Sequence, residues 1–320
     1  MITCPACRSS DISDEIISVK KDYSLSGYKY NKCSKCDSTY LADSSISSQD
    51  NLTEIHAKHW YESSNFKFMP EKGLLDRAIL AIPNVKTLLD DVIAFDVPMP
   101  KQILDVGCGN GEFVYAANYI GISSYGIEPN VKQFDIITHE PALKERLFSA
   151  SIEDIISISN GCKNSPSFPC GSNDLIILND VLEHLYDPFK SLEAIVKVLL
   201  NPSGGCIYIK IPSGVSLQMK LLGPYAWAFM APFHRILFSP KGLEYLLYSL
   251  KAKRVKQIPC IQKNWGWTRG ISWKMKFHEK HASLRDDKYF KSFDYGIDNF
   301  LDDYAISING APFLTVIALF

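Results

Sequence analysis

The chain has 320 residues, of which 46% are hydrophobic and 22% charged, and its formal net charge at pH 7 is −1. This length and composition can build one large domain and a smaller one around apolar cores, and they exclude a disordered chain. The near-neutral charge gives no broad field that would attract nucleic acid or anionic lipid, so composition does not favour a polyanionic partner.

The N-terminal residues show no secretory signal. Met1 leads directly to Cys4 without a basic and apolar segment, and the longest apolar stretch, 221–238, is interrupted by Pro224 and Pro232. We therefore expect a cytoplasmic protein with no transmembrane segment. In that compartment, cysteines serve as thiols or metal ligands more often than as disulfides.

Two C-x-x-C pairs stand near the N-terminus and are separated by 25 residues. Each pair bends the backbone so that two thiolates reach one ion, and four thiolates complete a tetrahedral shell with no position left for a substrate. The pattern predicts a zinc-ribbon module over 1–45 with a structural Zn²⁺. Its predicted ligands are Cys4, Cys7, Cys33 and Cys36.

Few apolar residues lie in this module, so we expect metal binding to supply much of its folding energy. The alternative is a redox C-x-x-C or two separate thiol pairs. Residues 41–49 then form a Ser/Asp-rich connection, and the sequence has helical character from Asn51 and over 72–89. We expect residues 46–95 to form a helical lid or linker region.

A buried strand and a glycine-rich turn follow at 103–111, before a predicted helix that begins at Glu112. Gly107, Gly109 and Gly111 lack a Cβ atom, so the backbone can adopt positive φ and approach a ligand at a helix N-terminus. The spacing G-x-G-x-G differs from the dinucleotide fingerprint G-x-G-x-x-G. Asp105 would repel a pyrophosphate but suits an ammonium group such as the methionyl end of S-adenosylmethionine. The loop therefore favours that cofactor.

Three further apolar runs read as strands of a parallel sheet. The first, 124–127, ends at Glu128, where an acid about twenty residues after the glycines can accept hydrogen bonds from both ribose hydroxyls. The others are 174–178, which ends at Asn179, and 205–211. A helix capped by a serine is expected over 239–250. Two more strands are expected at 253–259 and 313–320.

Four ordered segments resemble motifs of the class I S-adenosylmethionine-dependent methyltransferases, especially the small-molecule branch that includes quinone-biosynthesis enzymes. They are Asp105–Gly111, Tyr125–Asn130, Ser151–Ile155 and Asn179–Pro188. The resemblance covers residues 96–250. It implies a Rossmann-like α/β sheet, mostly parallel with an antiparallel last strand, in a domain over 96–320 with insertions at 214–236 and 260–310. An NAD-type or flavin-type Rossmann domain is the alternative.

The resemblance also assigns residues to the cofactor. It implies that Asp105 and the glycines contact the methionyl end, that Glu128 binds the ribose and that Glu153 lies near the adenine amine. The candidate cofactor residues are Asp105, Gly107, Gly109, Gly111, Glu128, Glu153 and Asn179. In related methyltransferases the preceding helical region folds over the cofactor, which makes Trp60 and Tyr61 candidate lid residues; aromatic packing under a helix is the alternative.

Methyl transfer from a sulfonium is an in-line displacement, which requires a positioned nucleophile and, for some acceptors, a base. His184 is the first candidate for that base because it follows the strand 174–178, at the sheet edge where ligands bind. His234 is the second. Either histidine has the alternative of holding a loop through hydrogen bonds, and Asp180 and Glu183 either orient a ring or cap a helix.

The segment 223–235 directly follows the strand 205–211 and is rich in aromatic residues between prolines. We expect it to form a wall of the acceptor site, with Tyr225, His234 and Arg235 as hydrogen-bonding or phosphate-pairing groups. The alternatives are a hydrophobic core and a peripheral membrane contact.

A zinc module joined to this methyltransferase core resembles bacterial enzymes that act on nucleotide sugars or polysaccharide precursors. The leading hypothesis is therefore a small-molecule methyltransferase with a sugar or sugar-containing acceptor. The second hypothesis is an RNA methyltransferase with the zinc ribbon as reader, which the lysines between 20 and 35 favour and the neutral overall charge opposes. The third is a non-catalytic cofactor-binding scaffold.

Overall fold

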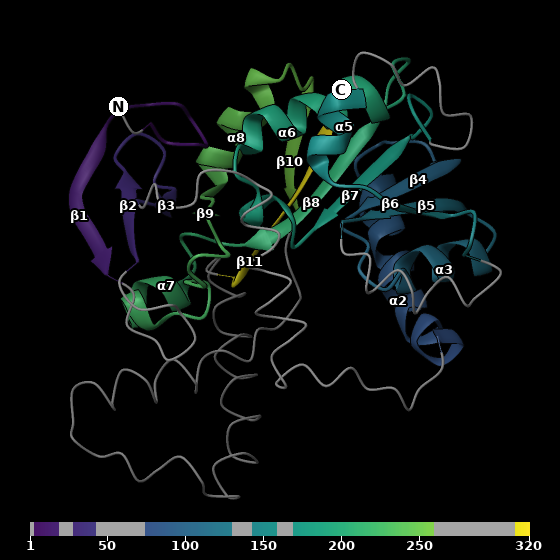
Figure 1. Ribbon diagram of the computed structural model, residues 1–320, viewed down its shortest axis with the longest axis horizontal. Helices are drawn as coiled ribbons and strands as arrows, with labels where there is room; N and C mark the ends of the chain where they lie inside the picture. The colour runs from purple at the N-terminus through teal and green to yellow at the C-terminus, as the bar shows by residue number, and fades with distance from the viewer. Residues whose placement is uncertain (1–2, 19–27, 43–73, 130–142, 159–168, 259–310) are drawn as a thin grey trace, which may run out of the picture. The chain divides into compact units, whose positions relative to one another are not determined.

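The computed structural model describes residues 3–18, 28–42, 74–129, 143–158, 169–258 and 311–320 (Figure 1). The side chains of 14–16, 74–78, 153 and 158 lie outside this description. Trp60, Tyr61 and the predicted insertion 260–310 also lie outside the described residues. Across the ranges given above, none of the helices has the length and apolar character needed to span a membrane.

The chain divides into two compact units. We call the first the cysteine unit; it comprises 1–47, 210–246 and 257–315. The second, the sheet unit, comprises 48–209, 247–256 and 316–320. The boundaries expected from the sequence at 45 and 95 stay a prediction.

The larger sheet has seven strands in the order β10-β11-β8-β7-β4-β5-β6 (Figure 1). Strand β4 pairs with β5 and with β7, and β5 pairs with β6, all in parallel. Strand β4 is therefore the point at which the strand order reverses: β5 and β6 follow on one side of it, and β7 and β8 on the other. The last strand, β11, lies between β8 and β10. The predicted α/β fold with a mostly parallel sheet is confirmed. The strand bounds are β4 Gln102–Val106, β5 Ser123–Glu128, β6 Leu147–Ser149, β7 Leu175–Asn179, β8 Cys206–Pro212, β10 Arg254–Ile258 and β11 Phe313–Leu319.

Continuous burial explains why the central strands are nearly free of polar residues. The first four residues of β7 are all buried, as are the last four of β4. Parallel strands covered on both faces have this composition rather than an alternating one. Asp105 is the exception in β4, where it pairs in register with Gly126 of β5 and Ile177 of β7.

The helices agree with the sequence signals at several ends. Helix α8 starts at Pro240, and the Ser239 hydroxyl accepts a hydrogen bond from the Gly242 amide at 2.9 Å, so the predicted serine cap is confirmed. Asp187 caps α6 by accepting from the Lys190 amide. The helical bounds are α2 Leu74–Ile93, α3 Glu112–Tyr119, α5 Ile152–Ile158, α6 Pro188–Ala194, α7 Leu217–Leu222, α8 Pro240–Ser249, the 3₁₀ turns η2 Leu182–His184 and η4 Gly223–Tyr225, and the π-helical turn η3 Ile195–Leu199.

The cysteine unit contains a four-stranded antiparallel sheet in the order β1-β2-β3-β9. Strands β1 (Ile12–Ser18), β2 (Lys29–Cys33) and β3 (Thr39–Leu41) come from the N-terminal segment, whereas β9 (Ile236–Leu237) follows β8 in the chain. In the β3–β9 pairing, Thr39 lies opposite Leu237 and Tyr40 opposite Ile236. The edge of the N-terminal sheet is therefore paired with a segment about 200 residues away, which covers its free hydrogen-bonding groups.

Candidate functional site

The glycine-rich turn after β4 has the backbone conformation that its composition predicts. Gly107, Gly109 and Gly111 have φ values of 75°, 53° and 75°, which L-residues with a Cβ atom rarely adopt. Gly111 is the N-cap of α3. The amides of Gly107 and Cys108 donate to the Ile127 carbonyl at 2.8 and 3.0 Å, so the turn is fastened to the end of β5.

The neighbours of this turn leave no room for larger residues. A Cβ atom on Gly107 would lie 2.6 Å from Val181 Cγ2, and one on Gly126 would lie 2.6 Å from Cys108 Sγ. Both distances are below van der Waals contact. The close packing of Gly107 against Val181, and of Gly126 against Cys108, therefore requires glycine at both positions. The requirement at Gly126 was not evident from the sequence, because this glycine lies inside a strand rather than in the turn.

Two buried carboxyl groups flank the turn. Asp105 in β4 is 6% exposed and Glu128 at the end of β5 is 8% exposed. The Gly109 amide donates to Glu128 Oε2 at 3.1 Å. Burial, followed by the charges of Glu128 and Glu112, raises the pKa of Asp105 to about 8. A cationic ligand group placed here would offset that repulsion and favour the ionised carboxylate.

The structure therefore brings Asp105, the three glycines and Glu128 together, as the sequence predicts. Asn179 lies at the carboxyl end of β7 with its side chain exposed, and the following residue, Asp180, has φ 54°. Glu153 belongs to α5, and its side chain lies outside the described residues. The cofactor roles of all these residues stay predictions.

His184 ends the 3₁₀ turn η2, where it neighbours an unusual carboxyl group. The Glu183 side chain is fully buried, and within the described structure neither of its oxygens has a hydrogen-bond partner. Burial, with a further contribution from Asp180, raises the pKa of Glu183 well above its ordinary value. Glu183 Oε1 lies 3.8 Å from His184 Nε2, and the His184 side chain is 23% exposed. A buried carboxyl group with a raised pKa thus adjoins a partly accessible imidazole.

His234 is a buried residue of the cysteine unit. Its ring is buried, its Nδ1 lies 2.7 Å from the Ala228 carbonyl oxygen, and it meets the Trp227 ring edge-on at 5.8 Å between centroids. Tyr225 is buried in the core of the cysteine unit. These contacts agree with the alternative in which the segment 223–235 packs internally. The catalytic role of His234 stays a prediction.

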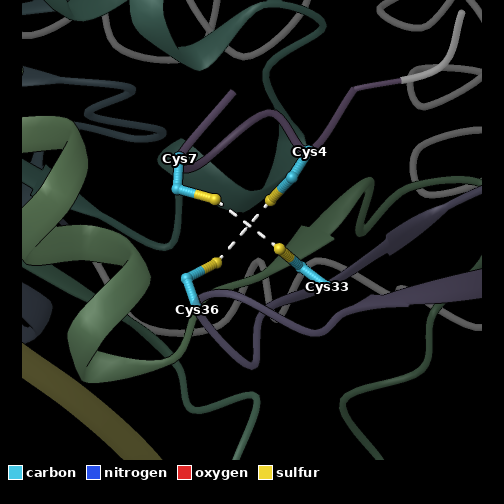
Figure 2. Close-up of side chains that lie close together, drawn as sticks. All are labelled: Cys4, Cys7, Cys33 and Cys36. Carbon is cyan, nitrogen blue, oxygen red and sulfur yellow. Dashed lines mark hydrogen bonds between the residues drawn. The ribbon is translucent and has the colours of Figure 1, made fainter. Parts of the chain in front are cut away.

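The four N-terminal cysteines converge on one point (Figure 2). Their sulfur atoms all lie within 4.8 Å of one another. Cys4 Sγ is 3.7 Å from Cys36 Sγ, and Cys7 Sγ is 3.5 Å from Cys33 Sγ. Four Zn–S bonds of about 2.3 Å in a tetrahedron separate the sulfurs by about 3.8 Å. The cluster therefore fits a tetrahedral Zn²⁺.

The two C-x-x-C turns have matching backbones. In the first, the Arg8 amide donates to the Cys4 carbonyl and the Cys4 amide to the Ser9 carbonyl, both at 2.8 Å. In the second, Asp37 and Ser38 make the same two bonds with Cys33, both at 2.9 Å. Arg8 and Asp37 have φ values of 58° and 64°. Each turn thus points its two thiols to the same side, as the sequence spacing implies.

The protonation of the cluster reflects the close packing of its sulfurs. The hydrogen bond between Cys4 and Cys36 raises the pKa of Cys4 and lowers that of Cys36 to about 5, while burial raises the pKa of Cys7 to about 11. Burial, with the charges of the four thiols, also raises the pKa of Tyr40 to about 12. A bound divalent cation would favour thiolates throughout the cluster, because metal ligation displaces the thiol protons.

Comparison with known proteins finds one matching family for the middle of the chain. A family model for a methyltransferase domain matches residues 81–249. A ubiquinone biosynthesis O-methyltransferase of Actinobacillus pleuropneumoniae serotype 7 (strain AP76) is 30% identical over 125 residues, which are 38% of this chain and 50% of that protein. A probable tRNA (uracil-O(2)-)-methyltransferase of Caenorhabditis elegans is 35% identical over 72 residues, which are 22% of this chain and 11% of that protein.

The chain therefore spans half or less of the length of these curated relatives. Among solved structures, a SAM-dependent methyltransferase from Archaeoglobus fulgidus is 18% identical with a TM-score of 0.46. That match covers 75% of this chain and 94% of the other.

Proposed function

The chain belongs to the family of methyltransferase domains, and we propose that it is an S-adenosylmethionine-dependent methyltransferase whose acceptor is a small molecule of the sugar, nucleotide sugar or polysaccharide-precursor class. The observation that carries the cofactor assignment is the turn at Gly107–Gly111 with a buried carboxyl group on either side. The near-neutral charge of the chain and its similarity to a ubiquinone biosynthesis O-methyltransferase support a small acceptor. The sugar class follows from the resemblance drawn from the sequence.

Asp105, Glu128 and the glycines of the turn each have a distinct proposed role. S-adenosylmethionine supplies an electrophilic methyl group on a sulfonium when it is bound. Asp105 pairs with the ammonium of the methionyl end, whose positive charge offsets the burial and the neighbouring carboxylates that keep the pKa of Asp105 high. Glu128 accepts hydrogen bonds from the ribose hydroxyls while Gly109 holds its Oε2. The positive φ values bring the backbone amides close to the ligand.

His184 is the proposed base for a hydroxyl acceptor. His184 would accept the proton of the acceptor hydroxyl while that oxygen takes the methyl group, and the electron pair of the broken carbon–sulfur bond would remain on the sulfur of bound S-adenosylmethionine. Glu183 orients the imidazole in this proposal, because its buried Oε1 lies 3.8 Å from His184 Nε2. Glu183 is thus a positioning residue in this proposal.

We further propose that Cys4, Cys7, Cys33 and Cys36 hold a structural Zn²⁺. The support is the fit of four converging sulfurs to a tetrahedral ion. Because four protein ligands complete the shell, the ion would have no open position for an acceptor and would act on folding rather than on chemistry.

An RNA acceptor is the second candidate function. It is favoured by the similarity to a probable tRNA methyltransferase, and by Lys29, Lys32 and Lys35 near the second cysteine pair. Lys35 lies over the Tyr245 ring at 5.6 Å, so part of this positive charge already faces an aromatic ring of the same unit. The small-molecule acceptor agrees better with the overall charge.

A turnover screen separates the two candidates. The full chain is incubated with S-adenosylmethionine and either a panel of nucleotide sugars or total RNA, and formation of S-adenosylhomocysteine is measured. We expect turnover with at least one sugar-containing acceptor and none above background with RNA. Turnover with RNA alone would replace the proposed acceptor by the second candidate.

A further inference from the structure

The N-terminal sheet of the cysteine unit makes main-chain contacts with the segment that follows β8. The Leu41 amide donates to the Arg235 carbonyl at 2.7 Å, next to the β3–β9 pairing. The Tyr30 hydroxyl donates to the His234 carbonyl at 2.6 Å, although Tyr30 is fully buried. Three consecutive residues, 234–236, are thus held to the N-terminal sheet through their backbones.

A second set of contacts starts at the C-x-x-C turn of Cys33 and Cys36. The Ser239 hydroxyl donates to the Cys36 carbonyl, and the Ser239 amide donates to Ser38 Oγ at 3.1 Å. Ser38 also makes a hydrogen bond with the Cys36 thiol. A Cβ atom on Gly242 would lie 2.0 Å from Ser38 Oγ, so the first turn of α8 requires glycine to fit against this turn.

The two segments also share one apolar core. Tyr30 and Leu41 from the N-terminal sheet pack with Met219, Tyr225 and Phe229. The rings of Tyr30 and Phe229 meet edge-on with centroids 5.1 Å apart. The segment 217–239 therefore buries its aromatic side chains against residues whose own fold is closed by the cysteine cluster.

We propose that the four-cysteine centre positions the segment 217–239, so that Zn²⁺ binding orders the stretch of chain that we expect to contact the acceptor. The inference rests on the proposed function only for the acceptor contact; the ordering itself concerns the cysteine unit alone. The contacts that transmit this ordering are the hydrogen bonds that link Cys36, Ser38 and Ser239, and the pairing of β3 with β9. The zinc module thus acts within its own chain, as a support for a neighbouring segment.

The physical reason is the small amount of apolar surface in the N-terminal segment. Without a metal, no coordinate bonds join the two C-x-x-C turns and the sheet between them is held less firmly, so Tyr30 and Leu41 lose their fixed positions. The segment 217–239 then loses its core partners, although it is far from the cysteines in the sequence. The turn at Gly107–Gly111 belongs to the sheet unit, and its hydrogen bonds within the described residues go to other partners.

Hydrogen exchange measured by mass spectrometry tests this inference on the full chain. Metal-loaded protein is compared with protein treated with a zinc chelator and with Cys36→Ser. We expect amide exchange over 28–41 and 217–239 to rise by at least about tenfold without metal, while exchange over 102–128 stays within about twofold. Affinity for S-adenosylmethionine should also stay within about twofold.

Two results would overturn the inference. Unchanged exchange over 217–239 in metal-free protein would show that this segment folds independently of the cysteine centre. A rise over 102–128 of the same size would show that the metal holds the whole chain. Neither hydrogen exchange nor cofactor affinity requires an acceptor. Failure to methylate a sugar would therefore contradict the proposed function without affecting the result on ordering.

Ser38→Ala tests the route with the metal still bound, and Ser34→Ala is its matched control. Both serines belong to the same C-x-x-C turn, but Ser38 is buried and Ser34 is exposed. We expect zinc content to be equal in the two variants and exchange over 236–243 to be higher in Ser38→Ala by at least about threefold. Equal exchange in the two variants would overturn the route through the serines.

Discussion

The two units of the chain encode their sites in different ways. In the sheet unit, the residues at the turn lie within 24 positions of one another, from Asp105 to Glu128, and one strand register aligns them. In the cysteine unit, the predicted metal ligands lie close together in the sequence. The groups that pack around them, however, come from about 200 residues further along the chain. The first site depends on backbone geometry and the second on long-range packing, so they should respond differently to mutation.

Loss of a cysteine ligand should have the largest effect and should be confined to one unit. The purified chain should contain one zinc, and Cys33→Ser should lose it, because three ligands leave the tetrahedral shell open. Apparent free energies of about 10–16 kcal/mol for structural zinc indicate that the unit would not fold without it. Elemental analysis and calorimetric titration with S-adenosylmethionine would measure the two properties separately.

Cofactor affinity in Cys33→Ser should stay near that of the parent chain, because the turn at Gly107–Gly111 lies in the other unit. Cys206→Ser is the matched control, since Cys206 is a buried thiol outside the cluster. Protein prepared without a chelator that contains no zinc would contradict the metal assignment. Loss of cofactor binding together with zinc would contradict the independence of the units.

The next largest effect should come from the proposed base. His184→Ala should lower the rate of methyl transfer by about 10²–10⁴-fold, the usual contribution of a positioned general base, with cofactor affinity nearly unchanged. Single-turnover kinetics would isolate that step. Undiminished transfer would return His184 to the alternative role of holding its loop.

Glu183→Gln sharpens the assignment of the base, because glutamine keeps the shape of a neutral acid. We expect this variant to fold, since burial already raises the pKa of Glu183 and favours its uncharged form. If Glu183 orients the imidazole, the pH profile of turnover should shift while the maximum rate falls modestly. An identical pH profile in the variant would show that Glu183 only fills space.

Removing one carboxyl group at the turn should weaken cofactor binding. A charge-assisted hydrogen bond contributes about 1.5–3 kcal/mol, so Asp105→Ala and Glu128→Ala should each raise the Kd by about 10- to 150-fold. Glu112→Ala is a useful control, because Glu112 raises the pKa of Asp105 less than Glu128 does and has no proposed contact with the cofactor. Calorimetry that finds the parent affinity in both variants would contradict the site.

Much of the sheet unit was predictable, because its motifs are local. The three glycines, Asp105 and Glu128 occupy adjacent strand ends, and parallel strands bring such ends to one edge of the sheet. The serine cap of α8 belongs to the cysteine unit and was predictable because it, too, is a local signal. The steric need for glycine at Gly126 was not, since it depends on where Cys108 points.

In the cysteine unit, the long-range contacts could not be predicted from local sequence signals. The spacing of the cysteines predicts the convergence of their sulfurs, and the structure has it. No pattern in residues 1–45 indicates that β3 pairs with β9 or that Ser38 meets Ser239, because such contacts depend on the path of the chain. The aromatic residues of 223–235 read equally well as a site wall or as a core, and only their partners distinguish the two.

The pH dependence of cofactor binding should follow from the pKa of Asp105. In the free protein this carboxyl group keeps its proton up to about pH 8, because burial and the charges of Glu128 and Glu112 oppose ionisation. A bound ammonium favours the carboxylate, so binding releases a proton below that pH. Affinity should therefore rise by up to about tenfold per pH unit between pH 6 and 8 and level off above pH 8.

The stability of the free protein should show the opposite trend, because the same carboxyl group is harder to ionise in the folded state. Between about pH 4 and about pH 8 the folded state holds a proton that the unfolded chain has lost, so the free energy of unfolding falls as the pH rises. Asp105→Asn should remove both dependences. Calorimetry in two buffers of different ionisation enthalpy would count the released proton, and an affinity that is flat from about pH 6 to 8 would contradict the role of Asp105.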